Sequence, residues 1–189
     1  MSVRFYEGER IYFRPVEPAD ETRLRRWIND PRVWATLYRC LPVNEIAERK
    51  WIESLAGDER NVVFAIVAQE DDRHIGTTGL HRIDPINRSA EFGILIGETE
   101  CQNSGYGSEA TALTVRFGFE VLNLHRIALA VFAGNARAIR AYEKAGFVRE
   151  GVNRQAYYRH GRWIDEVRYG LLHEEWRAQR VEPAEAAVA

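Results

Sequence analysis

The chain has 189 residues, of which 46% are hydrophobic and 29% charged, a composition typical of a folded globular domain. Its formal net charge of −2 gives no general electrostatic reason to bind nucleic acid or an anionic membrane, and we expect neither as a partner. Met1–Arg14 lacks the apolar run of a signal peptide, and no stretch is long and apolar enough to span a bilayer, so we expect a cytoplasmic protein.

The first half of the chain predicts a strand, two helices and then a meander of three strands. Pro31 should stop the first helix, Asn44 is suited to cap the second, and Gly57 is suited to end it. Short polar turns between the later apolar runs favour antiparallel hairpins. In order, the expected elements are strand Arg10–Arg14, helices Ala19–Asn29 and Glu45–Ala56, and strands Asn61–Ala68, His74–Ile83 and Ser89–Gly97.

The second half predicts helices and strands in alternation, closed by a hairpin. Asn135 is suited to cap the second helix, and Gly146 to follow its end. The whole pattern indicates an α+β fold in one domain over residues 1–180, with 181–189 as a flexible tail because this segment has Pro183 and little to pack. The expected elements are helix Gly105–Leu122, strand Arg126–Ala133, helix Ala136–Ala145, and strands Phe147–Tyr158 and Trp163–Leu172.

A glycine-rich segment between a strand and a helix is the most informative motif. It reads Gln102-Asn103-Ser104-Gly105-Tyr106-Gly107. Glycines at such a junction let backbone N–H groups converge on an anion at the helix N-terminus. By itself the motif also fits a tight turn without a ligand. It lacks the lysine of a nucleotide P-loop, and the strands before it form a meander rather than the βαβ unit that a dinucleotide fingerprint needs.

The motifs together resemble the GNAT (Gcn5-related) N-acetyltransferase superfamily, and the branch with ribosomal-protein N-terminal and spermidine acetyltransferases. Gln-x-x-Gly-x-Gly is the family's acetyl-CoA signature, and the segments 91–97, 123–126, 135–147 and 158–165 follow the family's order. The resemblance implies a mixed, mostly antiparallel sheet of about seven strands flanked by about four helices, with two splayed strands that hold the cofactor.

The same resemblance implies where acetyl-CoA binds. The backbone of Ile94, Leu95 and Ile96 should pair with the pantetheine arm, and Asn135 and Lys144 are further contacts. Arg137 and Arg140 are candidates for the outer phosphates, and the alternative for each is a solvated position on the helix surface. The pyrophosphate should lie against Gln102, Asn103, Ser104, Gly105, Tyr106, Gly107 and Ser108.

The chemistry of acetyl transfer needs a base for the acceptor ammonium and an acid for the departing thiolate. Tyr142 matches the family's acid position, although helical spacing from Ile139 also suits core packing. Glu91 is the expected base, directly or through water, and His81 on the neighbouring strand is its rival. No metal site is expected, because the histidines and the two cysteines have no ligand spacing.

The acceptor is the part that the sequence leaves open. Segment 34–41 contains Arg39 and no acid, which argues against a polyamine. Aromatic residues suit a peptide N-terminus or a small monoamine, or alternatively core or a dimer surface. A polyamine acetyltransferase and a catalytically silent acyl-CoA-binding module stay as alternatives, and a homodimer stays open. The aromatic residues in question are Trp34, Tyr38, Tyr157, Tyr158 and Trp163, and Leu37 is grouped with them.

Overall fold

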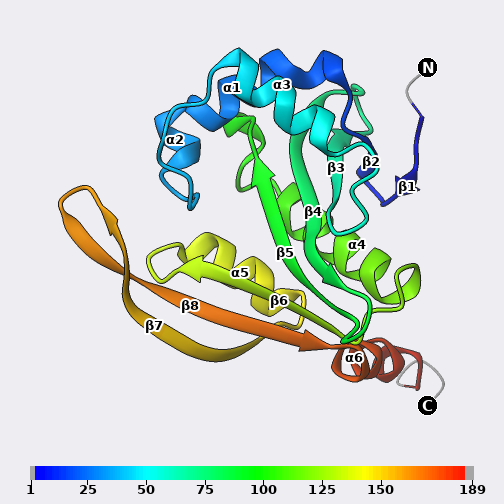
Figure 1. Ribbon diagram of the computed structural model, residues 1–189. Helices are drawn as coiled ribbons and strands as arrows, with labels where there is room; N and C mark the ends of the chain where they lie inside the picture. Colours follow the sequence, from blue (N-terminus) through cyan, green and yellow to red (C-terminus); the bar gives the residue numbers. More distant parts are fainter. Residues whose placement is uncertain (1–2, 186–189) are drawn as a thin grey trace.

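One mixed sheet of eight strands organises the molecule. The computed structural model describes residues 3–185. The strand order is β1-β2-β3-β4-β5-β6-β8-β7, and every neighbouring pair is antiparallel except β5 with β6 (Figure 1). The strands are β1 (Tyr6–Glu7), β2 (Ile11–Pro15), β3 (Val62–Ala68), β4 (His74–Asp84), β5 (Ser89–Ile96), β6 (Arg126–Phe132), β7 (Val148–Arg159) and β8 (Arg162–Leu172).

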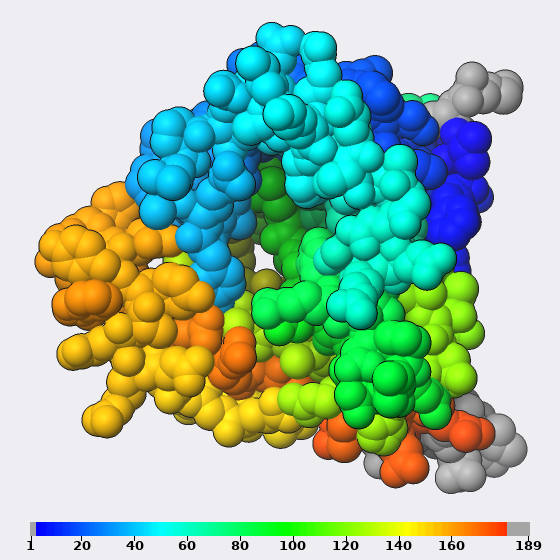
Figure 2. Space-filling model, in the orientation of Figure 1, coloured from blue at the N-terminus to red at the C-terminus, as the bar shows by residue number. Residues whose placement is uncertain are grey.

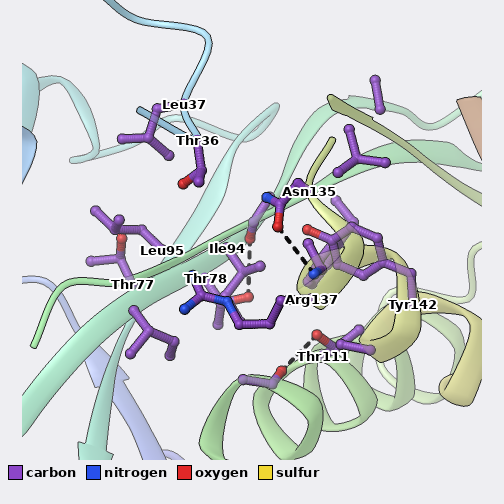
Figure 3. A pocket seen from close by; sticks show the side chains of 18 of the residues that line it. Thr36, Leu37, Thr77, Thr78, Ile94, Leu95, Thr111, Asn135, Arg137 and Tyr142 are labelled. Carbon is purple, nitrogen blue, oxygen red and sulfur yellow. Dashed lines mark hydrogen bonds between the residues drawn. The ribbon is translucent and has the colours of Figure 1, made fainter. Parts of the chain in front are cut away.

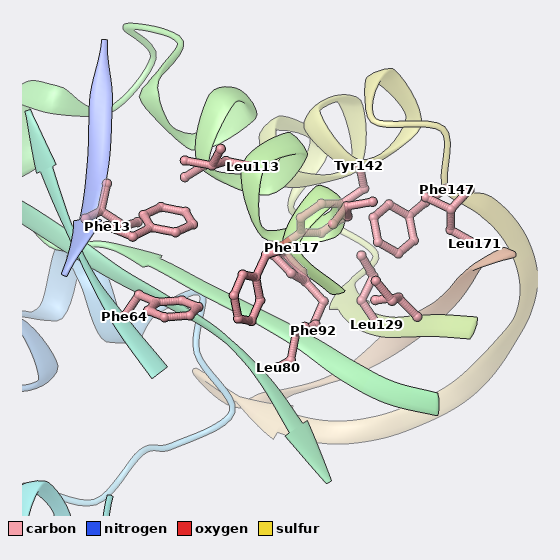
Figure 4. Close-up of a cluster of buried hydrophobic side chains, with 14 of the residues drawn as sticks. Phe13, Phe64, Leu80, Phe92, Leu113, Phe117, Leu129, Tyr142, Phe147 and Leu171 are labelled. Carbon is pink, nitrogen blue, oxygen red and sulfur yellow. The ribbon is translucent and has the colours of Figure 1, made fainter. Parts of the chain in front are cut away.

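Helices cover both faces of this sheet. The larger core lies under α4 and α5, where Phe92, Phe117 and Tyr142 belong to one buried cluster (Figure 4). On the opposite face, Leu24 and Trp27 of α1 pack with Ile52 of α3 and against Leu95 of β5. We call these the α4/α5 face and the α1/α3 face. The helices are α1 (Glu21–Asn29), α2 (Pro31–Trp34), α3 (Glu45–Ser54), α4 (Tyr106–Glu120), α5 (Ala136–Lys144) and α6 (His173–Glu185).

The parallel strands β5 and β6 pair only at their beginnings. Ser89, Ala90 and Glu91 face Arg126, Ile127 and Ala128, and no further pair follows. β5 continues to Ile96 along β4, whereas β6 continues to Phe132 along β8. The two strands therefore diverge, as the sequence predicted, and open a gap in the middle of the sheet (Figure 1).

A buried polar cluster attaches the first helix to the sheet. Asp20 accepts two hydrogen bonds of 2.7 Å from the Arg14 guanidinium and lies 3.0 Å from the His74 ring. Arg14 and His74 together hold the pKa of Asp20 well below its usual value, against the burial that would raise it. The cluster holds α1 in place over β4, so the α1/α3 face is rigid at this point.

The α+β architecture was predicted correctly, but the sheet has eight strands and six α-helices occur in residues 3–185. The extra elements are short or atypical. β1 has two residues, and α2 begins with Pro31 at its first position, capped by the Asp30 side chain. α6 runs through residues 181–185, which were expected in the tail, and 186–189 lie outside the described residues. No helix within 3–185 is long and apolar enough to cross a membrane.

Candidate active site

A cavity of about 860 Å³ occupies the gap between β5 and β6. It is lined from the α4/α5 face by the glycine loop and α5, and from the α1/α3 face by residues of α2, β4 and β8. Figure 2 shows the molecule hollowed between the blue and cyan N-terminal layer and the orange hairpin of β7 and β8. Because the gap in the sheet connects the two faces, a molecule bound on one face can meet a molecule bound on the other.

The glycine loop leaves the N-terminus of α4 without a side-chain cap. Gly105 takes a left-handed conformation, with φ of +88°, which favours glycine. Ser108 and Glu109 are the first residues whose N–H groups donate inside the helix, both to the Gly105 carbonyl. The N–H groups of Tyr106 and Gly107 precede them and are therefore available to an anion.

Gly107 keeps the space in front of this helix end open. A Cβ atom at Gly107 would lie 3.7 Å from the Ile96 side chain, an ordinary contact, so a larger residue fits the backbone there. Both residues line the cavity. A side chain at Gly107 would therefore enter the space where a ligand approaches the helix.

The edge of β5 that faces the gap offers unpaired backbone groups. The Gly97 N–H donates to Ile75 of β4, and Leu95 lies opposite Thr77, so alternation turns the backbone groups of Ile94 and Ile96 toward the gap. The Leu95 backbone instead belongs to the β4 ladder, and its side chain lines the cavity on the α1/α3 face. Of the three residues expected to bind pantetheine through the backbone, two have the required direction.

Gln102 connects this strand edge to α5. Its Nε2 donates to the Ile96 carbonyl at 3.0 Å, and its Oε1 accepts from Arg137 at 2.6 Å. Arg137 points into this part of the cavity (Figure 3). Arg140 and Lys144 also line it, which makes this mouth cationic. Asn135 also lines the cavity, while its Oδ1 caps α5 by accepting from Ala138 N at 3.2 Å.

Two residues of the expected cofactor loop stand outside the cavity lining. The side chain of Tyr106 is buried in the core, and the Arg10 guanidinium stacks on its ring at 4.3 Å. The Ser104 carbonyl accepts from Arg10 at 2.8 Å. Gln102, Asn103, Gly105, Gly107 and Ser108 do line the cavity.

Tyr142 packs in the core and also reaches the cavity. Its ring makes edge contacts with Phe92 and Phe147, at 5.9 and 6.2 Å between centroids. The residue is 9% exposed. It lines the cavity, as Figure 3 shows. Burial raises the pKa of its hydroxyl to about 12, so the phenol is protonated at neutral pH. The packing and catalytic interpretations of this tyrosine are compatible.

The two candidate bases lie side by side on the α1/α3 face. Glu91 of β5 is directly opposite His81 of β4. The Glu91 carboxylate forms an ion pair with Arg82 at the rim of the cavity, and its side chain is 38% exposed. Burial lowers the pKa of His81 below 6.5, so the imidazole is neutral at pH 7.

The surroundings of His81 define which ring nitrogen is free. Asn61 donates through Nδ2 to Asp58 at 2.8 Å, which orients its Oδ1 toward His81 Nδ1 at 3.3 Å. Nδ1 must then carry the proton, and Nε2 keeps its lone pair. A Cβ atom at Gly93 would lie 3.1 Å from Nε2, so the glycine leaves this nitrogen room beside the gap.

The aromatic residues of the N-terminal layer and the hairpin divide into two groups. Tyr38 and Tyr157 line the cavity, together with the aliphatic Leu37. Tyr158 and Trp163 instead form an exposed pair, with ring centroids 5.3 Å apart, toward the hairpin turn. Trp34 stacks on His160 at 5.6 Å and so joins α2 to the hairpin. Arg39, which argued against a polyamine, is not among the lining residues.

One acidic residue in the lining was not recognised from the sequence. Glu166 of β8 is 5% exposed and borders the cavity on the α1/α3 face. The signal was present: Val167 and Tyr169 point to the core, so alternation turns Glu166 and Arg168 to the other face. What the sequence lacked was the pairing that brings β8 beside the gap.

Comparison with known proteins gives one consistent family. A family model described as an acetyltransferase (GNAT) domain matches residues 10–148. The uncharacterized N-acetyltransferase YnaD of Bacillus subtilis is 39% identical over 168 residues, which are 89% of this chain and 96% of that protein. The putative ribosomal N-acetyltransferase YdaF of the same organism is 30% identical over 180 residues, 92% of this chain and 97% of that protein.

This chain is also similar to a solved acetyltransferase structure. The crystal structure of spermidine N-acetyltransferase from Vibrio cholerae in complex with CoA and spermine superposes with a TM-score of 0.84 at 25% sequence identity. The superposition covers 90% of this chain and 99% of that chain.

Proposed function

The chain belongs to the GNAT acetyltransferase family, and from this premise we propose that it transfers an acetyl group from acetyl-CoA to an α-amine of a peptide or to a small monoamine. The donor and the reaction class follow from the family, whose members use acetyl-CoA. The acceptor and the roles of individual residues are the proposal. The observation that carries it is the cavity that passes through the sheet beside Tyr142.

The donor half of the cavity fits a phosphate-bearing thioester. The free N–H groups at the start of α4 suit the pyrophosphate, and Arg137, Arg140 and Lys144 suit the remaining phosphates. The backbone edge at Ile94 and Ile96 suits the amides of the pantetheine arm. For that pairing, Gln102 would have to release the Ile96 carbonyl.

The reaction forms a C–N bond and breaks the thioester C–S bond. The acceptor arrives as an ammonium ion and must lose one proton before its nitrogen attacks. His81 Nε2 is suited to take that proton, and Glu91 is the second candidate, held by Arg82. Tyr142, protonated at neutral pH, is suited to donate to the sulfur as the C–S bond breaks.

The charge of the lining favours an acceptor with few positive charges. On the acceptor side, the carboxylates that line the cavity are Glu91 and Glu166, each with an arginine beside it, so this lining carries no net negative charge. Glu91 is paired with Arg82, and Arg168 lies 3.7 Å from Glu166. A polycation brought next to such arginines loses roughly 1 kcal/mol per close pair even in water, and more near a protein surface.

Polyamines remain a second candidate, because a spermidine acetyltransferase is among the structural neighbours and two carboxylates do border the cavity. A competition experiment decides. Spermidine, a ribosomal-type N-terminal peptide and a small monoamine are mixed at equal concentration with acetyl-CoA, and the products are identified by mass spectrometry. We expect acetylated peptide or monoamine to exceed acetyl-spermidine several-fold. Predominant acetyl-spermidine would show that the acceptor was assigned wrongly, and no thiol release with any amine would favour a silent CoA-binding module.

A further inference from the structure

Glu166 is a buried carboxylate that the proposed chemistry does not use. It lies opposite Phe132 of β6, and Phe132 is an even number of residues from Ala128, which is opposite Glu91. Glu166 and Glu91 therefore project on the same α1/α3 face, on the two sides of the gap. Glu166 is 5% exposed and lines the cavity.

The neighbours of Glu166 are mostly neutral hydrogen-bond partners. Asn153 Nδ2 donates to Oε2 at 2.7 Å, and Arg168 Nη1 lies 3.7 Å from the same atom. Arg168 is half exposed, so water screens its charge. The hydroxyls of Tyr38 and Tyr157 also interact with this carboxylate. A buried carboxylate is costly unless cations and hydrogen-bond donors compensate its charge, and an ammonium ion in the cavity would add to that compensation.

Three aromatic rings stand beside this carboxylate. Tyr38 lies 4.9 Å from Phe132 and 4.7 Å from Tyr157, and Phe132 lies 5.3 Å from Tyr157. Burial first, and then the charge of Glu166, raise the pKa of the Tyr38 and Tyr157 hydroxyls. Both phenols are thus close to Glu166 and remain protonated.

Arg159 contacts this ring cluster and the loop that carries Tyr38. Its guanidinium donates to the Tyr38 carbonyl at 2.6 Å, and its Cζ lies 5.6 Å from the Phe132 ring. The loop that carries Tyr38 is thereby tied to the hairpin. Tyr38, Tyr157 and Glu166 line the cavity, and Phe132 packs against the two tyrosines, so a ligand reaches the two phenol rings and the carboxylate from the cavity.

We propose that Glu166 binds the ammonium group of the acceptor, with Tyr38 and Tyr157, which pack against Phe132, around its apolar part. A carboxylate supplies the charge partner, and aromatic faces attract cations and pack against carbon. The inference deepens the proposed function and rests on it. Glu166 acts here as a specificity-determining residue, and it is assigned no covalent step.

The test is a binding measurement that needs no turnover. Full-length protein saturated with CoA is titrated in a calorimeter with phenethylammonium, and separately with its neutral counterpart 2-phenylethanol. Glu166→Gln retains the shape of the side chain and an oxygen for Asn153. We expect it to weaken phenethylammonium binding about 10- to 100-fold, the range for a lost charge-assisted hydrogen bond, and to leave the alcohol unaffected.

Glu150→Gln is the matched control. Glu150 lies on β7 of the same hairpin, is exposed, and pairs with Arg126 away from the cavity lining. It should bind both probes as the wild type does. Equal affinity of wild type and Glu166→Gln for phenethylammonium, or a wild type that does not prefer it over the alcohol, would overturn the inference.

Kinetics separate this inference from the proposed function. With an acceptor found in the amine competition, Glu166→Gln should raise the acceptor KM about 10- to 100-fold with little change in kcat or in the KM for acetyl-CoA. An equal fall in activity toward both substrates, with a lowered Tm, would indicate a structural role and refute the assignment. A wild type that fails to bind CoA would instead refute the proposed function.

Discussion

The two halves of the cavity are built in different ways. The donor half relies mainly on backbone groups, namely the first N–H groups of α4 and the free edge of β5. Its three cationic side chains all come from the single helix α5. The acceptor half relies on side chains from separate elements: Tyr38 after α2, His81 on β4, Tyr157 on β7 and Glu166 on β8. Backbone geometry tolerates substitution of most side chains, whereas a side-chain surface changes with each one. The donor half therefore suits a fixed cosubstrate, and the acceptor half suits divergence.

The largest effect is expected at Tyr142, where the two halves meet. Tyr142→Phe keeps the ring contacts with Phe92 and Phe147 and removes only the hydroxyl. Loss of a general acid typically costs about 100- to 10,000-fold, so kcat should fall by this much while Tm and CoA affinity change little. Thiol release, calorimetry and thermal melting measure the three. Full turnover with chemistry rate-limiting would leave Tyr142 as a packing residue only.

A change on the donor side should affect CoA and spare the acceptor. Gly107→Val places a side chain beside Ile96 in front of the α4 N-terminus, without the positive φ that makes Gly105→Val strained. Loss of charge-assisted hydrogen bonds to a phosphate should weaken CoA binding about 10- to 100-fold in calorimetry.

Gly134→Ala is a control for this variant, because a Cβ atom there meets nothing within 4 Å. It should bind CoA normally. Unchanged CoA affinity in a folded Gly107→Val protein would refute the phosphate assignment of the glycine loop.

The acid limb of the pH profile tests the base on the acceptor side. Burial lowers the pKa of His81 below 6.5, so the neutral, basic form is present above that pKa and is lost as the pH falls through it. Activity should then decline about tenfold for each pH unit below the pKa. His81→Gln should lower activity near neutrality and remove this limb, whereas Glu91→Gln should keep it. The opposite pattern would make Glu91 the base.

The smallest effect is expected for one cation of the donor mouth. Arg137→Ala removes a charge from the cavity lining and the hydrogen bond to Gln102. Exposed ion pairs contribute roughly 0.2–1 kcal/mol, so the KM for acetyl-CoA should rise about two- to fivefold, with the acceptor KM unchanged. Arg23→Ala on the exposed side of α1 serves as control. A rise in the acceptor KM instead would place Arg137 on the other side of the reaction.

The contrast between the donor half and the acceptor half also explains which features the sequence could predict. The elements around the glycine loop were placed to within a residue or two, because Gly105, Asn135 and the period of α4 are local signals. The splayed strands were implied by the family resemblance, whose motifs lie in one continuous segment, and the catalytic role of Tyr142 stays a prediction. The short α2 was missed because Pro31 was taken as a stop, although Asp30 and Pro31 also start a helix.

The acceptor side was harder because it depends on pairing. Trp34, Tyr38, Tyr158 and Trp163 are similar in sequence context, and only the fold separates Tyr38 at the cavity from the exposed pair. Glu166 looked like an ordinary charged strand residue until β8 was placed beside β6. Such long-range contacts leave no period or cap in the sequence, so tertiary structure alone reveals them.

The divergence of β5 and β6 also bears on how the protein avoids aggregation. A strand edge with free N–H and C=O groups is normally a hazard at the surface, because it can recruit a strand from another chain. Here two such edges lie inside the molecule, between the layers of α1 and α3 on one side and α4 and α5 on the other. The cavity there has a volume of about 860 Å³, the size of a small-molecule site rather than of a strand with its sheet. The fold thus keeps an incomplete hydrogen-bonding ladder ready for a small ligand while hiding it from other proteins.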